Sequence, residues 1–118
     1  MSLSVSTYIR RPDGGMEIVS VDSSDELAGF ECCRRDLWGH EFVRGLGLTL
    51  LPTLAEGDIY AEGEAVGRLQ SDIQCLLDHV TSVAEATRYT TDFITQRCQN
   101  ILGAIRRARE TGGGVVIW

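Results

Sequence analysis

Residues 115–118 read Val-Val-Ile-Trp, an uninterrupted apolar run that follows three glycines. A strand this short is stable only when it is buried between other elements, so the chain must contain a sheet that receives it. The N-terminal segment supplies one, because apolar and polar residues alternate over residues 3–9 and Pro-Asp-Gly-Gly at 12–15 leads into a β-branched run at 16–21. The sequence therefore predicts a hairpin that pairs with the final run, with Trp118 in the core.

Two later stretches follow helical periodicity. Apolar residues recur at steps of three and four from Glu64 to Ala84, which predicts an amphipathic helix of about five turns. Thr-Arg-Tyr-Thr-Thr-Asp at 87–92 interrupts this pattern and offers N-cap residues for a second helix. The same spacing resumes over residues 94–105 and ends in three nearby arginines, which suit the negative end of a helix dipole.

Two segments have weaker patterns. Ser23 and Glu26 have the spacing of a capping box, which predicts a helix from there to near Gly39. Residues 40–54 fit a short helix or an irregular packed segment. We therefore expect one globular domain over residues 1–118 of the α+β class: a small antiparallel sheet, made of the N-terminal hairpin and the C-terminal strand, packed on two long amphipathic helices and one or two shorter ones.

Composition limits the class of protein. With 43% hydrophobic and 24% charged residues, the 118-residue chain resembles an ordinary globular domain. No segment approaches the roughly 18 apolar residues of a membrane helix, and the first residues lack an apolar signal-peptide core, so we expect a cytoplasmic protein with no membrane partner. The four cysteines are expected to be free thiols because no pair has CxxC spacing, and Cys98 falls in the apolar stripe of the last helix.

The net charge of −6 is unevenly distributed along the chain. Residues 1–66 carry twelve acids and five arginines, net −7, whereas residues 67–118 carry five acids and six arginines, net +1. A negative potential repels phosphate backbones and attracts basic proteins. The charge therefore argues against nucleic acid as a ligand and favours a basic protein partner.

The acidic stretch at 55–70, AEGDIYAEGEAVGRLQ, holds four carboxylates within nine positions and no basic residue before Arg68. A calcium loop would need oxygen ligands where Ile59 and Tyr60 stand, and sequence spacing cannot show the dry pocket of a catalytic carboxylate pair. A solvated loop and a protein-binding surface remain open. We expect no catalytic residue, metal or cofactor, and hypothesise a partner-binding set with Tyr60 as the aromatic anchor: Glu56, Asp58, Tyr60, Glu62, Glu64 and Trp38. For Trp38 a core position remains open and is the favoured alternative.

A second group, Asp72, Cys75 and His79, is spaced to lie on the helix face opposite its apolar stripe. Cysteine and histidine four residues apart can share a transition metal, although a structural zinc site needs four ligands, for which His40 is the other histidine. The competing hypothesis is thus a small metal-binding or enzymatic domain. The simpler interpretation is an Arg68–Asp72 helix pair beside a half-buried cysteine and histidine.

Residues 50–80 carry a Leu-Pro-x-Leu turn, an Asp-x-Tyr, a Gly-Glu and a Leu-x-x-Asp-Ile helix. This segment resembles small uncharacterised actinobacterial proteins, some of them similar to immunity proteins of polymorphic toxin systems. The resemblance covers about a quarter of the chain and implies an acidic, non-enzymatic module that neutralises a basic partner.

Overall fold

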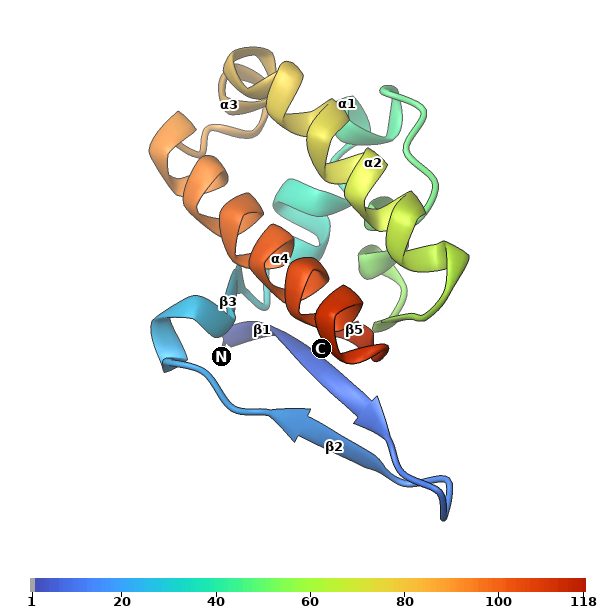
Figure 1. Cartoon of the computed structure of the whole chain (residues 1–118). Coiled ribbons are helices and arrows are strands. Elements are labelled where there is room, and N and C mark those ends of the chain that lie inside the picture. Colours follow the sequence, from blue (N-terminus) through green and yellow to red (C-terminus); the bar gives the residue numbers. More distant parts are fainter. Residues whose placement is uncertain (1) are drawn as a thin grey trace.

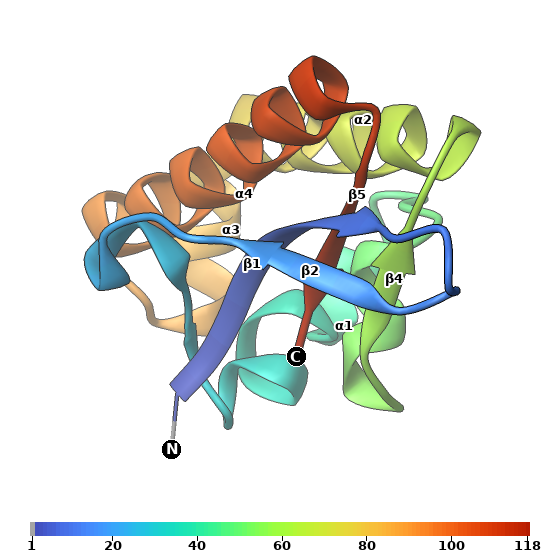
Figure 2. The ribbon, with the colours of Figure 1, turned by 60° about the horizontal axis from the view of Figure 1, so that its bottom comes forward.

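The computed structural model describes residues 2–118 and has an α+β architecture, with the helices gathered on one face of an antiparallel sheet (Figure 1, Figure 2). The strands are β1 (Ser2–Arg10), β2 (Met16–Val19), β3 (Leu27–Phe30), β4 (Ile59–Ala61) and β5 (Gly114–Ile117). The helical segments are η1 (Ser23–Glu26), η2 (Arg34–Trp38), α1 (Glu41–Arg44), η3 (Leu51–Ala55), α2 (Glu64–Asp78), α3 (Val80–Thr87) and α4 (Thr91–Thr111).

The sheet has the order β2-β1-β5-β4, and β3 pairs with the N-terminal part of β1. Strand β5 is antiparallel to both neighbours, with Val116 opposite Ser6 on β1 and opposite Tyr60 on β4. The predicted pairing of the apolar run with the N-terminal hairpin is confirmed. Gly114 is required where β5 begins, since a Cβ there would lie 2.6 Å from the Tyr8 ring.

The core lies between the sheet and the helices. Alternate residues of β1 and β5 face the helices, and they meet the apolar stripes of α2 and α4, as the sequence predicts. The residues shared by this core include Leu3, Val5, Val115, Ile117, Leu69, Ile73, Leu76, Ile94, Cys98 and Ile101. All four cysteines are free thiols, with Cys33 and Cys98 buried.

The predicted helix from Ser23 to near Gly39 is wrong. The segment forms a short 3-10 turn, then β3, then the single turn of η2. Glu26 does not complete a capping box: its carboxylate accepts a hydrogen bond from Ser6 Oγ at 3.1 Å, which ties the turn to β1. Pairing of β3 with β1 overrides the local helical pattern, and Gly29 has a φ of 115° that helix geometry excludes.

Other boundaries differ less. The helix predicted over 64–84 is divided at His79 into α2 and α3, and α4 begins after Thr90, whose side chain accepts from the Phe93 amide at 3.0 Å. The core prediction for Trp118 is wrong: its side chain is 41% exposed, because alternation along β5 points Val115 and Ile117 toward the helices and Trp118 away from them. None of the helices within residues 2–118 is long and apolar enough to cross a membrane.

Candidate partner-binding surface

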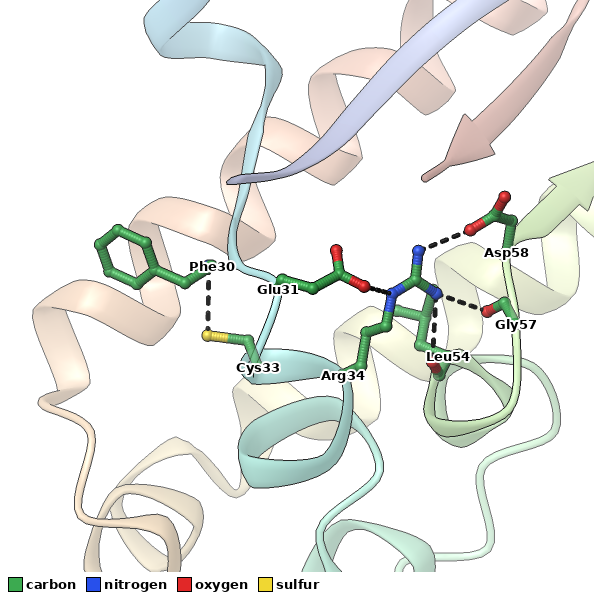
Figure 3. A network of polar contacts seen from close by, with 7 residues as sticks. All are labelled: Phe30, Glu31, Cys33, Arg34, Leu54, Gly57 and Asp58. Carbon is green, nitrogen blue, oxygen red and sulfur yellow. Dashed lines mark hydrogen bonds and ion pairs between the residues drawn. The ribbon is translucent and has the colours of Figure 1, made fainter. Parts of the chain in front are cut away.

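Two carboxylates of the acidic stretch lie in the loop between η3 and β4, which faces η2. Arg34 of η2 joins the two segments (Figure 3). Its Nη2 contacts Asp58 Oδ1 at 2.5 Å and its Nε contacts Glu31 Oε1 at 2.6 Å, while its Nη1 donates to the carbonyls of Leu54 at 3.2 Å and Gly57 at 2.7 Å. The Arg34 side chain is only 15% exposed, and its guanidinium pairs with carboxylates of the same chain. It is therefore not available to an outside ligand.

The ion pairs of Arg34 are strong enough to offset its burial. Burial alone lowers the pKa of the guanidinium, but the hydrogen bonds to Asp58 and Glu31 raise that pKa above its usual value. The arginine therefore stays charged and fixes the loop against η2.

A groove of about 570 Å³ opens between η2 and this loop. Its lining includes four carboxylates and two arginines: Glu31, Asp36, Glu56, Asp58, Arg34 and Arg35. Since Arg34 is tied inward, the side chains that face solvent are mainly acidic, and that of Glu56 is 69% exposed. We call this concavity the acidic groove. Its charge is complementary to that of a basic side chain.

The other end of the stretch lies beyond β4, next to β1. Glu62 accepts hydrogen bonds from the Tyr8 hydroxyl at 2.6 Å and from Arg10 Nε at 2.7 Å. The Tyr8 hydrogen bond, and then Arg10, lower the pKa of the Glu62 carboxyl below its usual value, although partial burial opposes them. Tyr60 packs edge-to-face on Tyr8, with ring centroids 6.4 Å apart, and remains 52% exposed on the helix-free face of the sheet.

The predicted surface is therefore not one uncompensated acidic patch. Glu56 pairs with Arg44, Asp58 with Arg34 and Glu62 with Arg10, so arginines from outside the stretch compensate three of its four carboxylates. The three arginines come from distant parts of the sequence, and no spacing rule could have assigned them. Glu64 is exposed in the first turn of α2, where it favours the helix dipole.

The interface role predicted for Trp38 is wrong. Its side chain is completely buried, and its indole N–H donates to the Ala28 carbonyl at 2.9 Å. Trp118 is the exposed tryptophan instead. Trp118 directly follows Ile117, whose partner on β4 is Ile59, and Asp58 of the acidic groove directly precedes Ile59. Strand alternation along residues 115–118 was a sequence signal that could have identified it.

The structure gives Asp72 a different role from the one predicted. Rather than facing solvent, its buried carboxylate accepts from the backbone N–H groups of Thr49 at 3.1 Å, Leu50 at 2.7 Å and Leu51 at 2.9 Å. Asp72 thus fixes the segment before η3 and does not form the simple Arg68 pair. His79 is exposed, with its Nδ1 2.8 Å from the Cys75 carbonyl oxygen.

Across the part of the chain that the structure describes, no three His, Cys, Asp or Glu side chains gather as metal ligands. Asp72 is already occupied by three amides, and His40 Nδ1 accepts from the Phe42 amide at the start of α1. The arrangement of Asp72, Cys75 and His79 therefore adds no support to the metal-binding alternative. No family model, curated protein or solved structure matches this chain.

Proposed function

We propose that this protein is a non-enzymatic protein-binding module that docks a basic partner at the acidic groove and the adjoining helix-free sheet face. The observation that carries the proposal is the convergence of Glu31 and Asp36 with Glu56 and Asp58 around one groove, with Arg34 held inward. A partner arginine or lysine can enter there and exchange water for charged hydrogen bonds.

Two exposed aromatic side chains extend this surface. Tyr60 stands on β4 and Trp118 follows β5, with exposed fractions of 52% and 41%. Tyrosine and tryptophan contribute disproportionately to binding energy when a partner desolvates them. In the proposed mechanism the acidic chain steers a basic partner to the groove, and the two aromatic side chains then slow its dissociation.

Within this class we propose an immunity-type role, in which the partner is a basic toxin. The support is the resemblance of residues 50–80, which include the loop side of the acidic groove, together with the net charge of −6. A cytoplasmic setting belongs to the same proposal and is supported by the four free thiols.

The experiment begins with affinity capture of a basic partner from the native host, followed by kinetic measurement with the purified pair. Tyr60→Ala and Trp118→Ala should each speed dissociation by about tenfold or more, because removal of a desolvated aromatic anchor costs at least about 1.4 kcal/mol. Phe42→Ala is the matched control, since Phe42 is an exposed aromatic of α1, 37% accessible, outside the proposed surface.

Equal dissociation rates for the parent, the two aromatic variants and Phe42→Ala would contradict the proposed surface. Failure of the parent to bind any basic protein of its host would contradict the proposed function itself. Circular dichroism and thermal melts of each variant confirm that a change in rate does not reflect unfolding.

A further inference from the structure

The side chains of Arg106 and Arg107 come together over Gly103 of α4, a position far in the sequence from the residues of the acidic groove. A Cβ placed on Gly103 would lie 3.3 Å from Arg107 Nη1 and 3.9 Å from Arg106 Nη2. Arg106 and Arg107 stand three and four residues after Gly103, so their side chains lean back along the helix over the space that glycine leaves. Two positive groups are thus held near each other on one helix face.

Within residues 2–118, neither guanidinium forms an ion pair with an acidic side chain. The four ion pairs formed within residues 2–118 use Arg10, Arg34 and Arg44, and no described side chain or carbonyl accepts a hydrogen bond from Arg106 or Arg107. The Nε of Arg107 is buried without a hydrogen-bond partner. Buried donors are normally satisfied, and adjacent like charges repel, so this arrangement favours a nearby anion.

The arginines border a concavity of about 250 Å³ between α4 and the η1 turn. Its other lining residues are Asp25, Gln96, Gln99, Asn100 and Gly103. Asn100 fixes the wall on the η1 side, because its amide nitrogen donates to the carbonyls of Ser24 at 3.0 Å and Leu27 at 2.9 Å. The η1 side of the concavity is therefore fixed before any ligand binds.

We propose that this concavity binds the phosphate group of a small phosphorylated metabolite. A single guanidinium satisfies the two oxygens of a carboxylate, whereas the three free oxygens of a phosphate monoester can accept from two guanidinium groups at once. The volume is below that of sites for drug-sized ligands, which indicates a small molecule. Asp25 leaves the lining with a net charge of +1, from two arginines and one acid, which disfavours an extended polyanion such as nucleic acid.

The test is a titration of the isotope-labelled protein, followed by amide chemical shifts, with inorganic phosphate, with glycerol phosphate and with sodium chloride at matched ionic strength. Either phosphate compound should give saturable shifts at Asp25 and in residues 99–107 that chloride does not reproduce. Tighter binding of glycerol phosphate assigns the site to a metabolite, and equal binding assigns it to the free ion.

The variants separate binding from folding. Arg106→Gln/Arg107→Gln should weaken phosphate binding by at least about tenfold, which corresponds to the loss of one charged contact. Gly103→Ala should also weaken it by crowding Arg107, while its melting temperature stays equal to or above that of the parent because alanine favours the helix. Arg109→Gln is the control and should bind like the parent, because Arg109 lies in the last turn of the same helix but is bonded to Gln70.

Shifts that chloride reproduces in full would overturn the proposal, as would a double arginine variant with the affinity of the parent. Gly103→Ala keeps the test decisive if the double variant fails to fold. The outcome is independent of the acidic groove, since none of these residues lines it.

Discussion

Glu62 contacts two residues of β1 that precede it in the sequence by more than fifty positions. Its carboxylate accepts from Tyr8 and Arg10 on β1, and these contacts hold its pKa below the ordinary value of 4.5. A carboxyl whose pKa is lower in the folded than in the unfolded state stabilises the fold above the unfolded value, and this stabilisation is lost as pH falls through the folded value.

We therefore expect Glu62→Gln to lower the free energy of unfolding at pH 7 by less than about 1 kcal/mol, since the pair is partly exposed to solvent. The difference from the parent should shrink as pH falls below 4.5 and through the lower folded pKa of Glu62, because the protonated carboxyl is neutral like the glutamine amide. Urea denaturation over a pH series from pH 7 downward measures it, with Glu17→Gln at an exposed position of β2 as the control. A difference that stays undiminished down to the lowest pH at which the parent is folded would mean that the ionised carboxylate does not stabilise the fold.

For single residues, the sequence predicted exposure or burial in some cases but not the contacts with distant segments. Tyr60 was identified as exposed and Cys98 as buried, because each follows from local pattern and side-chain chemistry. The roles of Arg34 and Asp72 could not be predicted, since both bind segments more than twenty positions away. Trp118, expected in the core, is exposed, and Trp38, included in the partner-binding set, is buried as its core alternative requires, because burial depends on which face of an element packs.

Whole elements were predicted where periodicity was strong. The hairpin, α2, α4 and β5 follow from apolar spacing, and they form the layers that the spacing implies. Strands β3 and β4 were missed because each is short and depends on pairing with a strand distant in the sequence. Strand β4 lies inside the acidic stretch, which sequence analysis treated as a loop or a surface.

Strand β5 is the element on which the sheet depends most, because it lies between β1 and β4. Deleting residues 115–118 removes three fully buried side chains, each worth about 1.5–3 kcal/mol. We expect the truncated chain to be largely unfolded at room temperature, or to melt many degrees below the parent, as followed by circular dichroism. Trp118→Ala should have a much smaller effect. A chain that stops at Gly114 and melts at the parent temperature would show that β5 does not share the core.

At the scale of the whole molecule, the proposed function makes charge and shape act on the same partner. The net charge of −6 is concentrated in residues 1–66, which supply all four carboxylates of the acidic groove and both strands of the hairpin. Long-range attraction of this kind raises the rate of encounter and is screened by salt. In the proposed complex, the contacts that desolvate Tyr60 and Trp118 would set the lifetime. The two contributions can be measured separately.

The most direct measurement is the association rate with the captured basic partner at low and high ionic strength. Asp36→Asn/Glu56→Gln removes two exposed groove charges and leaves both carboxylate partners of Arg34 in place. Glu85→Gln/Glu110→Gln makes the same change in net charge at exposed positions outside the groove. We predict that the groove variant associates several-fold more slowly at low salt and depends less on salt, while the control stays close to the parent. An association rate and salt dependence of the groove variant equal to those of the parent would contradict docking at the acidic groove.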